Sequence, residues 1–230
     1  HSYSSAASDV YKRQAFFALI FLHMFRGMMY GSYQKPRELL WVLGWITYFL
    51  LCALGFTGYV LPWGQMSFWA AQVIMSLFGS IPYIGEDLLT WIRGDYLISG
   101  ITLNRLFAFH VVLLPLALIA VVFVHILALH EVGSNNPDGV DVKKFKDADG
   151  VPLDTKPFFP YDVMHDLYAI GVFLIFFVAI MFFYPDGGGY VIEYVNYEAA
   201  DILKTPEHIV PSWYYTPCLL YTSPSPRDQL

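Results

Sequence analysis

The chain has 230 residues, of which 57% are hydrophobic and only 14% are charged, and its mean hydropathy is +0.48. Soluble domains carry about 25% charged residues, so this composition excludes an ordinary soluble domain and indicates an integral membrane protein. The formal net charge is −6, and we expect no nucleic-acid partner. The two cysteines, Cys52 and Cys218, predict neither a disulfide framework nor a zinc site.

Four apolar segments predict helices, at residues 15–29, 39–61, 106–129 and 167–184. The first has about fifteen residues, fewer than the roughly 20 that span a bilayer, so we expect it to be part of a longer helix. Residues 66–78 form an amphipathic stretch that we expect at the membrane surface, and residues 82–85 form a turn. The prediction is an all-α integral membrane protein, a transmembrane helix bundle truncated at both ends.

Lysines and arginines mark the loops after the first and third segments as cytoplasmic. The loop between the second and third segments balances Glu86, Asp87 and Asp95 against two arginines and is expected outside. The helices then alternate in direction, which puts His110 near the outer side of the membrane and His125 near the inner side.

The two ends of the chain differ from the rest. Residues 1–14 are polar and break abruptly into a membrane segment, and residues 218–230 are unrelated to what precedes them. We expect both to be non-native flanks, and residues 15–217 to be an internal fragment of a longer protein.

Two histidines stand in the charge-free segment 106–129. A ring nitrogen in hydrocarbon is costly unless something binds it, so His110 and His125 are candidate ligands. Fifteen residues put the rings about 22 Å apart along the axis and about 60° apart around it. This geometry suits two cofactors stacked across a bilayer; a hydrogen-bonded structural role or a proton relay in a transporter is the alternative.

His23, near the inner end of its segment, is expected at the same depth as His125. Neutral imidazoles from two helices are good axial ligands of haem iron, so His23 and His125 can hold one haem. Arg26 lies on the face of His23 and can pair with a haem propionate. Gly44 and Gly58, fourteen residues apart, would let a flat macrocycle approach the backbone, or would serve helix packing instead.

Six stretches together make the chain similar to a known family. It resembles cytochrome b, the di-haem quinol-oxidising subunit of the respiratory quinol–cytochrome c reductase (complex III), and the general style of the sequence suggests a bacterial version. The stretches follow one another in family order: HMFRGMMYGSY (23–33), GYVLPWGQMSFW (58–69), IPYIG (81–85), LNRLFAFH (103–110), HILALHEVGSNNPDG (125–139) and TPEHIVPSWYYTP (205–217).

The resemblance implies two b-type haems in the full-length protein. His23 and His125 match the ligands of the inner, high-potential haem, and His110 matches one ligand of the outer, low-potential haem. The second outer ligand is expected at position 9, which holds Asp9, so that site is incomplete here. The implied segments are a half helix at 15–33, helices at about 39–61, 103–130 and 163–184, and an outer-site loop at 185–217.

The spacing of His110 and His125 is fifteen residues, whereas many respiratory members of the family have fourteen. One extra residue rotates a ligand by about 100°. We expect Pro115, which lies between the two histidines, to kink or locally adjust the helix and so absorb this rotation.

The resemblance also implies an outer quinol-oxidation site built with Pro211, Trp213 and Tyr214 and with the segment that follows GYVLPWG (58–64). The family has glutamate between the first two, and this chain has Ser212, a weak proton acceptor. Another group is then expected to take the quinol proton, such as Glu207, His208 or a water chain. Ala70 stands where many members have glycine, and we expect it to narrow the pocket and reduce sensitivity to strobilurin-type inhibitors.

An inner quinone-reduction site maps to His130, Ser134 and Asp166, where a histidine and a carboxylate can deliver two protons. His165 stands where the family often has lysine; it can supply charge or a proton there, or form an ordinary interfacial polar pair with Asp166.

The function implied is quinol oxidation with a divided electron path. One electron leaves to a Rieske iron–sulfur protein and a cytochrome c-type subunit, and the other crosses the two haems to quinone, with proton translocation. The implied setting is a dimeric complex in the lipid bilayer of the bacterial inner membrane. Two alternatives remain: a di-haem membrane anchor of another dehydrogenase, and a proton-coupled transporter with intramembrane histidines.

Overall fold

The computed structural model describes residues 3–140, 144–153, 155–185, 193–209 and 211–216, with side chains from residue 11 onward. The chain divides into two compact units, one comprising His1–Trp41 and Ala128–Ile192, the other Val42–Leu127 and Glu193–Leu230. The described residues contain helices and no strand, and the expected all-α membrane class is confirmed.

The first helix, α1, runs from Tyr3 to Met29. It begins well before residue 15 because the preceding stretch holds alanine, serine and other helix-compatible residues and neither glycine nor proline. Asp9 lies on this helix, and its side chain is outside the described part. The chain turns after α1 at Gly31, where a positive φ of 65° favours glycine.

Three stretches are long and apolar enough to cross a membrane, in the part of the chain that the structure describes. They are α2 (Glu38–Val60), the rod Gly100–Val132 and the rod Phe158–Phe183. The most apolar part of Gly100–Val132 has a mean hydropathy of 2.9, and none of this part is buried inside the protein. An apolar surface of this extent is stable against lipid, where a helix satisfies its own backbone hydrogen bonds.

The last rod consists of a π-helical turn, η3 (Phe158–Asp162), followed by α7 (Val163–Phe183). It belongs to the first unit and packs against α1 within it. The hydroxyl of Tyr11 on α1 donates to the carbonyl of Tyr184 at the end of α7, at 3.2 Å.

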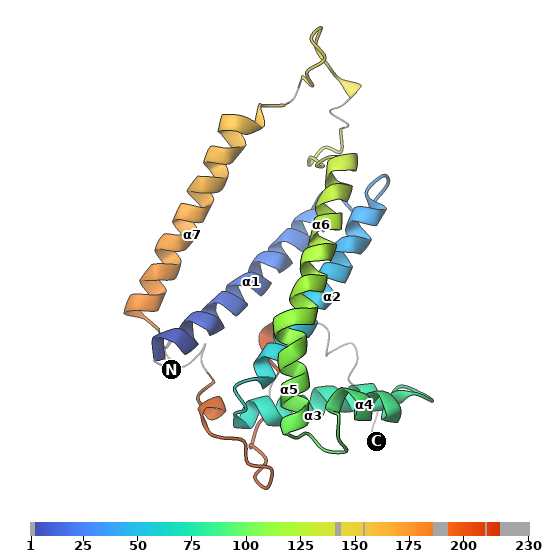
Figure 1. Ribbon diagram of the computed structural model, residues 1–230. Coiled ribbons are helices and arrows are strands. Elements are labelled where there is room, and N and C mark those ends of the chain that lie inside the picture. The colour runs from blue at the N-terminus through green and yellow to red at the C-terminus, as the bar shows by residue number, and fades with distance from the viewer. Residues whose placement is uncertain (1–2, 141–143, 154, 186–192, 210, 217–230) are drawn as a thin grey trace, which may run out of the picture. The chain divides into compact units, whose positions relative to one another are not determined.

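The rod Gly100–Val132 is drawn in Figure 1 as one continuous helix made of α5 (Gly100–Ala108) and α6 (Leu114–Val132). Its start is fixed by a capping box, in which the Ser99 side chain accepts from Ile101 N–H and the Ser99 N–H donates to Thr102 Oγ1.

Between α5 and α6 lies one π-helical turn, η1 (Phe109–Leu113). Its Leu114 N–H donates to the carbonyl of Phe109, five residues back instead of four. Pro115 follows directly and has no N–H to donate, so a regular α-helical hydrogen bond is lost at this point in any case. The local adjustment expected beside Pro115 is therefore a π-turn, and His110 lies within it.

The buried core of the second unit lies where α2 ends. Here α3 (Gln65–Gly79) and α4 (Gly85–Arg93) pack against each other. The amphipathic stretch predicted at 66–78 is α3, and the predicted turn at 82–85 leads into α4, a short helix that the sequence analysis missed. The core residues are Val60, Phe68, Ala71, Met75, Leu89, Ile98 and Leu106.

Candidate functional site

His110, on η1, is held by a defined hydrogen bond to α2. Its Nδ1 lies 2.9 Å from the carbonyl oxygen of Leu54 and 3.4 Å from Thr57 Oγ1. A carbonyl can only accept, so Nδ1 carries the hydrogen and Nε2 keeps a lone pair. A backbone acceptor that fixes the ring orientation and tautomer in this way is typical of a metal-ligating histidine.

The two glycines of α2 each face one histidine of the partner helix, in the same unit. A Cβ built on Gly58 would overlap the His110 imidazole and lie 2.9 Å from its Nδ1. A Cβ built on Gly44 would lie 3.4 Å from Cε1 of His125. The structure thus pairs each predicted glycine with a predicted ligand, at two levels of one helix pair. An imidazole at each of the two levels is a donor that haem iron takes, so the residues present fit a haem in their donor chemistry.

His23 and Arg26 lie on α1, in the first unit, whereas His125 belongs to the second. The pairing of His23 with His125 therefore stays a prediction. The Arg26 guanidinium donates to the carbonyl of Asn135 at 3.1 Å and stacks over the Tyr30 ring, 4.6 Å from its centre. Arg26 anchors the loop after α6 to the end of α1, and its predicted contact with a haem propionate is not tested.

The same loop is held by groups that the sequence analysis did not single out. Arg37 donates from Nε to the carbonyl of Gly133 at 3.1 Å and from Nη2 to that of Ser134 at 3.4 Å. The Asn135 amide donates to the carbonyl of Tyr30 at 2.6 Å. These contacts join segments about a hundred residues apart, which a sequence pattern cannot reveal.

The three residues of the predicted inner quinone site all lie in the first unit and are exposed. His130 stands in the last turn of α6, Ser134 follows it, and Asp166 is in the first turn of α7. Among the described residues, no hydrogen bond joins Asp166 to His130 or to Ser134. The structure thus leaves the grouping of these three side chains as a prediction.

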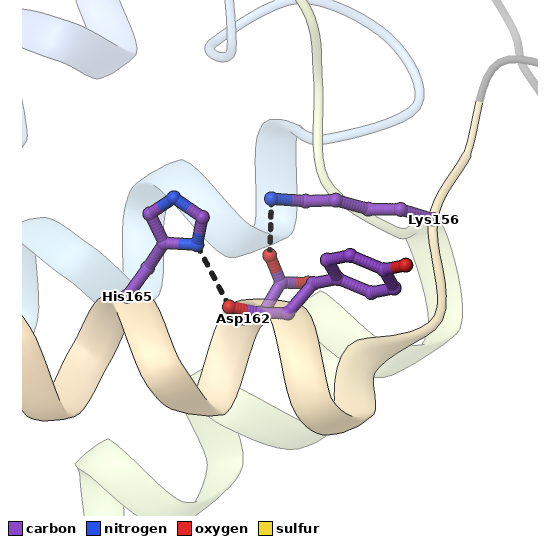
Figure 2. A network of polar contacts seen from close by, with 4 residues as sticks. Lys156, Asp162 and His165 are labelled. Atoms are coloured by element: carbon purple, nitrogen blue, oxygen red, sulfur yellow. Dashed lines mark hydrogen bonds and ion pairs between the residues drawn. The ribbon is translucent and has the colours of Figure 1, made fainter.

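A polar network does form at the start of α7, on neighbouring positions (Figure 2). Lys156 Nζ lies 3.1 Å from Asp162 Oδ1, and His165 donates from Nδ1 to the carbonyl of Tyr161 at 2.7 Å. His165 is therefore bonded to the backbone one turn earlier. The ion pair uses Asp162, a carboxylate the sequence analysis did not select.

On the second unit, the segment after Glu193 docks on the start of α3. Gly64 pairs with Ala199, and a Cβ at Gly64 would overlap the backbone at Asn196, so only glycine permits this approach. The Asn196 side-chain oxygen accepts from the N–H of Ser67 at 2.8 Å. Asn196 and Ala199 lie in the predicted outer-site loop, 185–217, but the motifs did not predict its docking on α3.

Gln65 completes the docking with its side-chain amide. Its Nε2 donates to the carbonyl of Lys204 at 2.7 Å, and its Oε1 accepts from the N–H of Asp201 at 2.8 Å. Only 3% of Gln65 is exposed, so both polar ends of a buried amide are satisfied. The segment that leads to the predicted outer site is thus fixed to α3.

The motif Pro211-Ser212-Trp213-Tyr214 forms a tight turn, since Trp213–Tyr215 is a single 3-10 turn, η6. Tyr214 is fully buried, whereas Trp213 is 47% exposed. The hydroxyl of Tyr215 donates to the carbonyl of Cys52 on α2 at 2.9 Å. The turn is therefore held against α2 by Tyr215.

A small apolar cluster includes Tyr59, Met66 and Ala70, and Ile209, two residues before the motif, packs against it. Ala70 is 9% exposed, so its methyl group occupies space in this cluster, and the narrowing of a quinol pocket stays a prediction. The Tyr59 hydroxyl donates to the carboxylate of Glu193, which is an exposed residue. This carboxylate is a proton acceptor that the sequence analysis did not consider.

The two Gly–His pairs and the docked outer segment all lie within the residues that match one protein family. The family model described as cytochrome b (N-terminal)/b6/petB matches residues 14–217. The chain belongs to the cytochrome b family. Membership implies haem.

Cytochrome b relatives agree over most of the chain. The protein of Allochromatium vinosum is 53% identical over 206 residues, which cover 88% of this chain and 50% of that protein. The protein of Cereibacter sphaeroides is 48% identical over 202 residues, covering 88% of this chain and 44% of that one. The chain spans about half the length of the curated relatives it matches.

A solved structure gives the same result for the fold. A chain of a hyperthermophilic respiratory complex III has a TM-score of 0.81 and 33% sequence identity to this chain. The match covers 93% of this chain and 55% of that chain. The predicted relationship to cytochrome b of complex III is confirmed at the level of the family.

Proposed function

We propose that this chain is part of the cytochrome b of a bacterial quinol–cytochrome c reductase, in the inner membrane. The observation that carries the proposal is the pairing of Gly58 with His110 and of Gly44 with His125 on one pair of helices. Two ligand levels on membrane-spanning helices suit electron transfer from one side of the bilayer to the other. The family match and the complex III neighbour support the same assignment.

Bis-histidine haem exchanges single electrons without an open coordination position, and this is the chemistry that the bound group supplies. His23 and His125 are proposed as the ligands of the inner haem and His110 as one ligand of the outer haem. The Leu54 carbonyl keeps the hydrogen of His110 on Nδ1, so that Nε2 keeps the lone pair with which His110 would hold the haem iron. Arg26 is proposed to balance a propionate charge.

Pro211, Trp213 and Tyr214 are proposed to line the outer quinol site, beside the Tyr59 cluster. Ser212 is a poor base, and Glu193 is proposed to take its place through Tyr59. A quinol hydroxyl proton passes to the Tyr59 oxygen while the Tyr59 hydroxyl proton passes to the Glu193 carboxylate. The quinol loses one proton, Tyr59 is unchanged, and Glu193, being exposed, releases the proton to water.

At the inner side, His130 and Asp166 are proposed to deliver protons to a quinone, with Ser134 as a hydrogen-bonding group. All three are exposed at the ends of α6 and α7, where protons from the cytoplasm can reach them. A Rieske iron–sulfur protein and a cytochrome c-type subunit are the proposed electron acceptors on the outer side, in a dimeric complex.

The test is a reduced-minus-oxidised visible spectrum of the native membrane complex. We expect two b-type haem bands that appear on addition of quinol. The His110→Leu variant is expected to lose the outer band and the His125→Leu variant the inner one. A complex without a Soret shift would contradict the proposal, and two bands that quinol cannot reduce would favour a haem-bearing anchor of another dehydrogenase.

A further inference from the structure

The two glycines of α2 and the two histidines of the partner helix have sequence spacings that differ by one residue, and each glycine nevertheless faces one histidine. On α2, Gly44 and Gly58 are fourteen residues apart, in an uninterrupted α-helix. On the partner helix, His110 and His125 are fifteen residues apart. Each glycine still faces one imidazole, with 3.4 Å from a Gly44 Cβ to His125 Cε1 and 2.9 Å from a Gly58 Cβ to His110 Nδ1.

Regular helices would not allow this match. Fourteen α-helical residues turn through about 1400°, which is about 40° short of four turns, whereas fifteen turn about 60° beyond four turns. A regular helix would therefore rotate His110 about 100° away from the direction that the glycines define. At a backbone radius of about 2.3 Å, this moves its Cα by roughly 3.5 Å, which is more than the 2.9 Å bond to Leu54 can tolerate.

The π-turn η1 takes up the additional residue. Its Leu114 N–H bonds to the carbonyl of Phe109, so this ring encloses one more residue than an α-helical one. The α-helices on either side then keep the relative rotation of a helix that is one residue shorter. Pro115 follows directly and donates no backbone hydrogen bond, so the helix already lacks one α-helical bond where the additional residue is accommodated.

We propose that η1 is a positioning element of the haem centre: it absorbs the fifteenth residue, so that His110 and His125 stay on the face of their helix that meets Gly58 and Gly44. The proposal rests on the proposed haem binding. It predicts that the number of residues inside η1 can change by one without loss of the ligand geometry, whereas the number in the regular helix cannot.

The experiment uses the native membrane complex and two variants. One deletes Val112, a turn residue that is 55% exposed. The other inserts one alanine between Leu118 and Ile119, in the regular part of α6. The readouts are the ratio of haem to protein, the reduced-minus-oxidised spectrum and the low-spin haem signals in electron paramagnetic resonance.

We expect two haems per chain in the native protein and after the deletion, with both low-spin signals retained. The insertion is expected to lose the outer haem and leave one. Loss of the outer haem on deletion of Val112, or two haems after the insertion, would overturn the proposal. A native complex without haem would instead contradict the proposed function.

Where neither variant assembles, an experimental structure of the unmodified complex decides. A π-turn at 109–113 with both imidazoles on one side of the helix supports the proposal. An uninterrupted α-helix from Gly100 to Val132 refutes it.

Discussion

Gly58→Ala is the substitution for which the structure gives the sharpest expectation. The added Cβ overlaps the His110 imidazole and lies 2.9 Å from Nδ1, a separation that Cβ atoms do not sustain. The ring has to move, which weakens its 2.9 Å bond to the Leu54 carbonyl. Gly44→Ala is the matched control, because its Cβ would meet His125 at 3.4 Å, an ordinary contact.

The expected cost follows from three terms. Overpacking of a filled site costs about 1–3 kcal/mol and a lost hydrogen bond about 1 kcal/mol. Alanine regains up to about 1 kcal/mol over glycine in a helix. The net penalty on the ligand geometry is roughly 1–3 kcal/mol, or about a 5- to 150-fold weaker hold on the outer haem.

The assay is the haem content of purified complex, read from the two b-type bands in a reduced-minus-oxidised spectrum. Gly58→Ala is expected to diminish the outer band selectively, and Gly44→Ala to preserve both. Equal loss in the two variants, or an undiminished outer band in Gly58→Ala, would show that the close approach of Gly58 to His110 does not govern the site.

Four further outcomes are expected. Glu193→Gln removes the carboxylate that accepts from Tyr59 and is expected to slow quinol oxidation at least tenfold with both haem bands intact. The reason is that general-base catalysis contributes about 10²–10⁴-fold to a rate. An unchanged rate would exclude Glu193 as the proton acceptor. Gln65→Ala removes two hydrogen bonds and is expected to destabilise the docked outer segment by about 2 kcal/mol, measured as faster proteolysis of that segment. Asp166→Asn is expected to slow haem reoxidation by quinone without lowering the melting temperature; a normal rate places the inner proton donor elsewhere. Ala70→Gly is expected to lower the inhibitor concentration that half-blocks quinol oxidation for strobilurin-type compounds, and an unchanged inhibition curve contradicts the narrowing.

Much of the fold follows from local properties of the sequence. A membrane-spanning helix satisfies its own backbone hydrogen bonds and exposes apolar side chains to lipid, so each such span is encoded in about 20 contiguous residues. The segments at 39–61 and 106–129 show this. The histidines were also identifiable as candidate ligands, because a polar ring in such a segment needs a partner.

Other features depend on contacts between distant residues and escaped prediction. The docking of Gln65 and Ser67 on the segment 196–204 joins residues more than a hundred positions apart. The bond from Arg37 to Gly133 likewise joins residues that are 96 positions apart. Polar residues on an amphipathic helix look solvent-exposed in the sequence. Only the tertiary structure shows that Gln65 and Ser67 are buried and that their hydrogen bonds fix the outer segment.

The sequence by itself determined that this is a membrane protein of the cytochrome b family and which histidines are its candidate ligands, because composition, apolar runs and motifs are properties of short stretches. The tertiary structure decided how those ligands are presented. The fifteen-residue spacing of His110 and His125 predicts a rotation of about 60° in a regular helix. The facing glycines, Gly44 and Gly58, are only fourteen residues apart, and both helices have to present their facing groups at the same two levels. The π-turn at Phe109–Leu113 takes up the additional residue and so makes the two spacings compatible.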